Sequence, residues 1–209
     1  MATFSGLTAQ EIQILKRLDA PQKIQDFLNS LPINFERSRE TCFSPQQVLQ
    51  KRRAHCAEGA IFAAACLMFH GQKPLLLDLK TTKDDLEHIV ALFRRDGRWG
   101  AISKTNHAVL RYREPVYKTV RELALSYFHE YFLNNGQKTL RAFSDPFDMS
   151  KIKETDWLVS EDACWQIVSQ LDKIRHHSIL TPRQIKKLRQ ADNIEIKAGK
   201  LKEYRPGSF

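Results

Sequence analysis

The sequence lacks the marks of several large protein classes. No apolar run reaches the roughly 18 residues that a membrane-spanning helix needs, so we expect no membrane partner. The first residues, Met1–Ser5, show no basic stretch followed by an apolar core, so we expect no secretory signal. There is no internal repeat and no low-complexity segment. What remains is a globular chain with enough residues to bury a core.

Cysteine is also scarce. The four cysteines, Cys42, Cys56, Cys66 and Cys164, are widely and irregularly spaced, which indicates free thiols in a reducing, cytoplasmic compartment rather than a disulfide framework. No C-x-x-C pair is present, so a zinc ribbon is not expected. The pair His176-His177 has no carboxylate or cysteine at ligand spacing. We therefore expect no metal and no cofactor.

Acidic residues are few toward the end of the chain. The 209 residues carry a formal net charge of +9, and the segment from Lys173 onward holds ten Lys or Arg against three Asp or Glu, which is +7 of that total. We predict a near-neutral core over 1–150 and a basic, helical extension over 151–209. The extension could bind an acidic partner or nucleic acid, or simply be a solvated surface. Only Tyr204 and Phe209 offer rings for base stacking.

Helix start signals dominate the first fifty residues. Thr8 with Glu11 three residues later predicts a capping box on a helix to Leu18. Pro21 predicts the start of a second helix that ends before Pro32. Ser44-Pro45 predicts a third start.

The middle of the chain changes from helix to strands. Cys56–Phe69 is apolar and rich in alanine, which predicts a buried central helix closed by Gly71. Apolar runs over 74–79, 88–93, 98–102 and 109–112 predict strands, and Asp96-Gly97 predicts a hairpin turn between two of them. The elements predicted after them are helices at Val116–Leu133 and Ser160–Ile174, a basic helix from Thr181 to about Ala191, and a mobile end over Lys197–Phe209. This order predicts an α+β fold.

Cys56 and His88 carry the strongest chemical pattern. Cys56 lies in the first turn of the predicted central helix, where the helix dipole favours thiolate over thiol. His88 opens a predicted strand about thirty residues later. A helix-start cysteine followed by a strand-start histidine suits nucleophilic catalysis. The alternative is that Cys56 is a small core residue and His88 a polar group at a strand end.

Three segments together resemble the transglutaminase-like superfamily, whose core is papain-like. They are Ser44-Pro45 through Cys56-Ala57-Glu58-Gly59-Ala60 to Gly71-Gln72-Lys73-Pro74, then His88–Phe93, then Gly97–Ile102. The resemblance covers about residues 20–110 and suggests a small member of bacterial type. It implies a central helix packed on an antiparallel sheet, with Cys56 as nucleophile and His88 as its base. It also implies acyl transfer through a Cys thioester at the amide bond of a peptide or protein, as in a cysteine protease, amidase or transglutaminase-type acyltransferase.

The chain departs from the family at the third catalytic position. The family places an acid four residues after the strand tryptophan, and Ser103 stands there after Trp99. A serine could accept a hydrogen bond from the histidine but brings no charge. Asn106 is a second candidate, because Cys-His-Asn also works in papain-like enzymes; Asp78 and Asp96 fit less well. A catalytically weakened peptide- or protein-binding module is therefore an alternative function, and a nucleic-acid-associated protein is another.

An acyl transfer also needs donors for the oxyanion. We expect the backbone N–H of Cys56 to be one of them. A side chain from the preceding segment, Gln46, Gln47 or Gln50, is a candidate for the other. His55 is interpreted as a local polar contact that points away from the sulfur.

Overall fold

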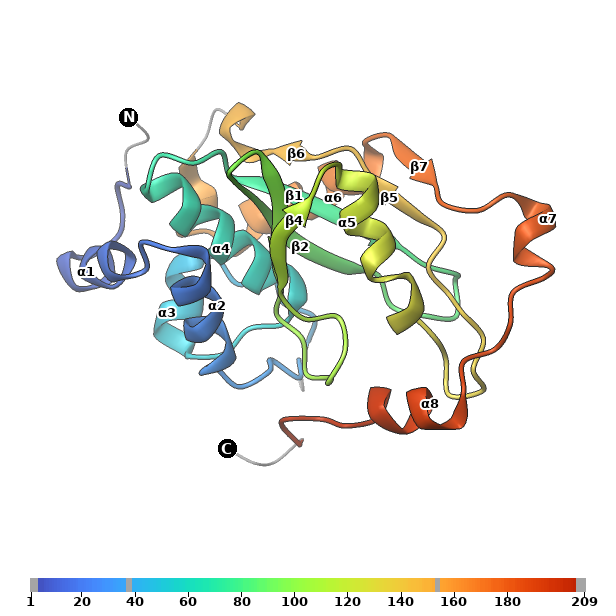
Figure 1. Ribbon diagram of the computed structural model, residues 1–209. Coiled ribbons are helices and arrows are strands. Elements are labelled where there is room, and N and C mark those ends of the chain that lie inside the picture. The colour runs from blue at the N-terminus through green and yellow to red at the C-terminus, as the bar shows by residue number, and fades with distance from the viewer. Residues whose placement is uncertain (1–3, 37–38, 153–154, 206–209) are drawn as a thin grey trace.

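The protein is an α+β molecule in which helices lie on both sides of one antiparallel sheet (Figure 1). The structure, a computed structural model, describes residues 4–36, 39–152 and 155–205. Within these residues the sheet has the strand order β4-β3-β2-β1-β5-β7, and β6 also pairs with β1. The predicted α+β class is confirmed.

The strands are short apart from the central pair. Their bounds are β1 (Leu75–Lys80), β2 (His88–Arg95), β3 (Arg98–Ile102), β4 (Arg113–Tyr117), β5 (Ala142–Ser144), β6 (Phe147–Asp148) and β7 (His176–Ser178). The helices are α1 (Ala9–Arg17), α2 (Pro21–Asn29), α3 (Pro45–Lys51), α4 (Cys56–Phe69), α5 (Val120–Ser126), α6 (Glu161–Lys173), α7 (Pro182–Ile185) and α8 (Asn193–Gly199). Short 3₁₀ turns are η1 (Phe128–Glu130), η2 (Met149–Lys151) and η3 (Thr155–Leu158).

Helix α4 is the centre of the larger core. It begins at Cys56 and ends at Phe69, as predicted, and most of its residues are buried. Its alanines allow close packing, so α4 lies against β2 while α1, α2 and α3 cover it from the other side (Figure 1). Because both faces are covered, α4 is apolar all round rather than amphipathic.

The N-terminal helices begin where their capping residues stand. Thr8 and Glu11 form the predicted capping box of α1, and Ser44 forms one with Gln47 at α3. The β2–β3 hairpin turns at Asp96 and Gly97, with φ of 50° and 74°. Two successive left-handed residues form the turn that matches the twist of the flanking strands, so the predicted hairpin is confirmed.

The predicted helix Val116–Leu133 is wrong at both ends. Residues Arg113–Tyr117 instead form β4, which pairs with β3 at the edge of the sheet, where Pro115 is tolerated because an edge strand has unpaired N–H positions. The helix proper is α5 (Val120–Ser126), whose Leu123 packs in a second, smaller core on the other face of the sheet. The predicted strand at 109–112 is also wrong, since Leu110 has a left-handed φ of 61°.

The region after residue 150 joins the same sheet and the larger core. Helix α6 packs Cys164, Ile167 and Leu171 into that core, and β7 pairs with β5. The predicted helix 181–191 is limited to α7. The chain over 197–205, predicted as mobile, instead completes α8 and runs beside residues 106–108; residues 206–209 lie outside the described part. No helix among the described residues is long and apolar enough to cross a membrane.

Candidate active site

Cys56 is the first residue of α4, and its neighbours fix the start of the helix. His55 is the N-cap, and its Nδ1 accepts the Ala57 N–H at 3.2 Å. Glu58, in the third position of the helix, accepts the His55 backbone N–H at 2.8 Å. The backbone N–H of Cys56 has no acceptor among the described residues. Such an unpaired N–H is usual in the first turn of a helix, and it leaves a donor beside the Cys56 sulfur.

Glu58 is fully buried and holds this corner together. Its carboxylate accepts hydrogen bonds from Asn34 Nδ2 at 3.0 Å, from Thr41 Oγ1 at 2.8 Å and from the Phe43 N–H at 2.9 Å. A buried carboxylate is tolerated where several donors replace the water it has lost. Glu58 thereby ties the loop before α3 to the first turn of α4. Beside it, His55 Nε2 lies 2.9 Å from the Thr41 carbonyl oxygen.

His88, the buried first residue of β2, is oriented by Ser103. His88 Nε2 lies 2.8 Å from Ser103 Oγ, and Ser103 Oγ lies 2.5 Å from the Leu110 carbonyl oxygen. A carbonyl only accepts, so the serine hydroxyl donates to Leu110 and accepts the Nε2–H of His88. This arrangement leaves Nδ1 as the ring nitrogen that can exchange a proton with Cys56.

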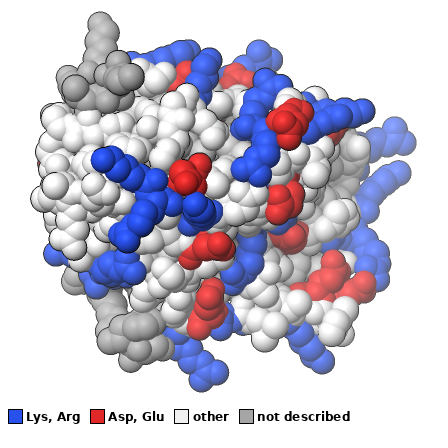
Figure 2. Space-filling model, turned by 60° about the vertical axis from the view of Figure 1, so that its left-hand side comes forward, with Lys and Arg blue, Asp and Glu red and all other residues white. Residues whose placement is uncertain are grey.

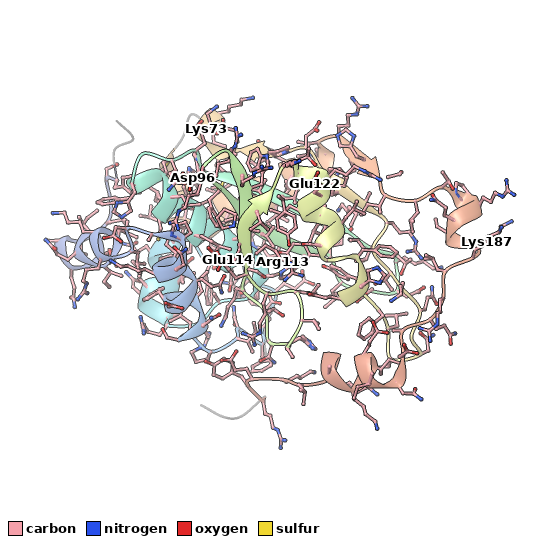
Figure 3. All side chains as sticks on the ribbon, in the orientation of Figure 1. Lys73, Asp96, Arg113, Glu114, Glu122 and Lys187 are labelled. Carbon is pink, nitrogen blue, oxygen red and sulfur yellow. The ribbon has the colours of Figure 1, made fainter. Side chains whose placement is uncertain are left out.

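Ser103 is itself held on three sides. Gln25 of α2 donates to the Ser103 carbonyl at 2.8 Å and accepts its N–H at 2.9 Å. Leu110, in its left-handed conformation, donates its N–H to Glu130 at 2.6 Å, and Glu130 pairs with Arg113 at 2.6 Å. Arg113 is the first residue of β4, and its Nε donates to Ser126 Oγ at the end of α5 at 2.9 Å (Figure 3). The acceptor behind His88 is thus anchored to both cores.

The electrostatics favour a thiolate at Cys56. Burial raises the pKa of this half-buried thiol, but the imidazoles of His55 and His88 outweigh burial and lower the pKa to about 5. Burial also raises the pKa of Cys66, farther along α4, and no imidazole opposes it there. A low pKa of this kind is typical of catalytic cysteines.

Cys56, His55 and His88 open onto a cleft of about 660 Å³. Asn106 also lines it, but the Asn106 amide is committed elsewhere: Nδ2 donates to the Tyr204 carbonyl at 3.0 Å and Oδ1 accepts the Tyr204 N–H at 2.9 Å. Of the two sequence candidates for the third position, the structure brings Ser103 to His88 and gives Asn106 a different partner. Asp78, the less suitable acid, bonds His176 Nε2 at 3.0 Å.

The loop after β3 approaches α4 closely. A Cβ on Gly59 would lie 2.5 Å from Lys104 Cβ, so only glycine fits there. Lys104 is buried, and its ammonium donates to the Leu28 and Leu31 carbonyls at the end of α2. Burial lowers the pKa of Lys104 to about 8. Gly59 and Lys104 together fix how closely the Ser103 loop approaches the first turns of α4.

Sequence reasoning placed two features wrongly. The glutamines of α3 face α1 instead of the cleft: Gln46 and Gln50 donate to Glu11 at 3.0 Å each, and neither lines the cleft. His55 does not point away from the site, because it lines the cleft beside Cys56. The spacing His55-x-x-Glu58, an N-cap residue followed by glutamate, was the sequence signal for its position.

One cluster of three carboxylates, of which Glu87 also lines the cleft, has ligand-like geometry. Asp78, Glu87 and Asp172 bring carboxylate oxygens within 4.8 Å of one another. Lys80 Nζ already lies among them, at 3.3, 2.5 and 2.6 Å respectively. The ammonium therefore occupies the place a cation would take.

The fold and the site define an α+β protein with a cysteine–histidine pair in a cleft. Comparison of the chain with protein-family models finds no matching family, and comparison with curated proteins finds no match.

Proposed function

We propose that this protein is a transglutaminase-like cysteine hydrolase or acyltransferase that acts on an amide bond of a peptide or protein. The observation that carries the proposal is the line of groups from Cys56, at the start of a buried helix, to His88 and on to Ser103 on the next strand. The transglutaminase-like resemblance is supported by the same order of elements: a cysteine helix packed on an antiparallel hairpin that begins with the histidine.

The geometry supports an acyl transfer in two steps. The Cys56 thiolate attacks the amide carbonyl carbon, and the Cys56 N–H stabilises the oxygen that becomes negative. Protonated His88 gives its Nδ1 proton to the leaving amine as the C–N bond breaks, which leaves a thioester on Cys56. Water or a second amine, deprotonated by His88, then attacks the thioester and releases the acyl group and the thiolate.

Ser103 orients His88 without charge. The hydroxyl fixes Nε2–H by accepting it, and the Leu110 carbonyl places a partial negative charge behind the hydroxyl. A neutral partner stabilises imidazolium less than a carboxylate does. We therefore expect slower turnover than a full Cys-His-acid site would give.

The same serine favours the alternative, a fold that retains the cleft and binds a peptide without cleaving it. Such a module would bind a peptide equally well in wild type and in Cys56→Ala. An enzyme would turn it over only with Cys56 present.

A nucleic-acid role through the basic segment has weaker support. Lys and Arg are interspersed with Asp and Glu on the face shown in Figure 2. Lys187 lies two residues after the end of α7, far from α1 and α2 (Figure 3). Nucleic-acid binding would give a steep loss of affinity with salt, and that loss would be reduced in Lys186→Gln/Lys187→Gln.

The first test is alkylation by iodoacetamide, read for each cysteine by mass spectrometry across pH, on wild type and His88→Ala. We expect fast labelling of Cys56 well below pH 8 and slower labelling in the variant. Cys56 labelling no faster than that of an unfolded cysteine, or indifferent to His88, would overturn the catalytic proposal. A screen of amide substrates, with Cys56→Ala as control, then separates hydrolysis from amine transfer.

A further inference from the structure

One wall of the cleft comes from the far end of the chain. We call residues 193–205, α8 and the extended stretch after it, the C-terminal wall. The stretch pairs with the Ser103 loop: Ala108 N–H donates to the Leu201 carbonyl at 3.1 Å, and Glu203 N–H donates to the Asn106 carbonyl at 3.0 Å. The Asn106 amide adds its two bonds to Tyr204. The wall therefore has a fixed register.

Side chains fasten the wall at three more points. His107 Nδ1 lies 2.8 Å from the Gly199 carbonyl oxygen, and the Tyr204 hydroxyl donates to the Asn29 carbonyl at 3.0 Å. Arg111 pairs with Glu203 at 3.0 Å. The wall is thus attached to α2 as well as to the loop that carries Ser103.

Lys200 and Lys202 are presented to the cleft by this register. Lys200 is the C-cap of α8, Lys202 forms a β-bridge with His107 of the Ser103 loop, and both lysines line the cleft. Leu201 between them is 64% exposed. Neither lysine has an ion-pair partner within the described part of the chain.

The acids that line the cleft are already engaged. Glu87 pairs with Lys80 at 2.5 Å, and Glu130 pairs with Arg113. Asp85 accepts a hydrogen bond from Thr139 Oγ1 at 2.5 Å. Lys104 is the third lysine of the lining, and its ammonium group donates to carbonyl oxygens at the end of α2. Among the Lys, Asp and Glu side chains of the described lining, the ammonium groups of Lys200 and Lys202 have no partner, while Asp85 keeps its negative charge because its side-chain partner is a neutral hydroxyl.

We propose that Lys200 and Lys202 are specificity-determining residues that select substrates with a carboxylate close to the reacting amide, such as an acidic peptide. The substrate part of this proposal rests on the proposed function. The charge selection itself acts on any small electrophile that reaches Cys56. It can therefore be measured without catalysis.

The test compares two alkylating reagents of similar size and different charge, iodoacetate and iodoacetamide, at Cys56. The ratio of their rates reports the local potential, and the iodoacetamide rate reports the thiolate. In Lys200→Gln/Lys202→Gln we expect the iodoacetate-to-iodoacetamide ratio to fall about three-fold at low ionic strength, and the difference to shrink in high salt. The iodoacetamide rate should stay unchanged, which also shows that the variant is folded.

Lys186→Gln/Lys187→Gln is the matched control, because it removes the same charge from exposed positions that do not line the cleft. An equal ratio in wild type, control and wall variant overturns the proposal. Slow iodoacetamide labelling of Cys56 in wild type would instead contradict the proposed function while leaving the ratio informative. Where an amide peptide is turned over, kcat/KM for an acidic peptide over its neutral amide analogue should fall by the same factor in the wall variant only.

Discussion

The two ends of α4 carry the same residue type in opposite chemical states. Cys56 lies at the first position with two imidazoles nearby, and together these lower its pKa to about 5. Cys66 is fully buried among apolar side chains, and burial raises its pKa. Ten residues of one helix thus separate a thiolate from an inert thiol.

The difference shows that position and neighbours decide the chemistry of a cysteine. Both residues are on α4, most of whose residues are buried in the larger core. The N-terminal end has the unpaired Cys56 N–H, the imidazoles of His55 and His88 and the buried carboxylate of Glu58, whereas the imidazole of His70 at the other end bonds the Leu15 carbonyl oxygen. The reactive end of the helix is therefore a polar assembly built onto an apolar support.

The largest expected effect is the difference in labelling rate between Cys56 and Cys66. At pH 7 in the native protein, iodoacetamide should label Cys56 at least about a thousand-fold faster than Cys66, because Cys66 must wait for local unfolding. Site-resolved mass spectrometry over a time course measures both rates. Comparable rates would mean that the helix start does not activate Cys56, or that burial does not protect Cys66, as described.

Glu58→Gln tests the polar assembly. The amide would place donors against the Asn34, Thr41 and His55 donors, so we expect a loss of about 3 kcal/mol in unfolding free energy. Urea denaturation followed by circular dichroism measures it. Glu122→Gln is a matched control, since Glu122 is also the third residue of its helix but exposed (Figure 3), and it should cost less than about 1 kcal/mol. Equal losses in both would contradict the role of Glu58.

His88→Ala should move the pH midpoint of Cys56 alkylation. Thiolate forms as pH rises through the pKa, so wild type should be half-reactive near pH 5. Removing an imidazole that favours the thiolate should raise this midpoint by roughly one to two units. His177→Ala removes a surface histidine that pairs with Asp145 and should leave the midpoint in place.

Ser103→Ala has the smallest expected effect. The variant removes one hydrogen-bond partner from His88, which is worth about 1 kcal/mol, so Cys56 labelling at pH 4, below the wild-type midpoint near pH 5, should slow about five-fold. Ser103→Thr, which keeps the hydroxyl, should recover most of the rate. If the threonine variant is as slow as the alanine variant, the hydroxyl is not what orients His88.

Local signals explain what the sequence could predict. The capping residues Thr8 and Ser44, the alanines of α4 and the Asp96-Gly97 turn each act within a few residues, so their elements were predicted close to their actual bounds. The pairing of Cys56 with His88 followed from the same local order. Ser103 was expected near His88 because it stands four residues after Trp99, and the two side chains are in contact.

The parts that were missed depend on distant contacts. Strands β5, β6 and β7 are two or three residues long and form only because β1 and β5 offer edges; a segment that short has no periodicity to detect. The partner of Asn106 lies 98 residues away. No pattern within the Asn106 loop could indicate that its amide would hold the C-terminal wall.

The attachment of the C-terminal wall also sets an order of assembly. His88 and Ser103 are 15 residues apart in sequence, whereas the wall contacts span 98 residues to Asn106 and 175 to Asn29. Contacts between distant residues carry a larger loop-closure entropy and tend to form late, and during synthesis they must wait for the chain to emerge. Cys56 and His88 can thus come together on the ribosome while the cleft still has an open side. Selectivity for charge would be the last property the protein acquires as it matures.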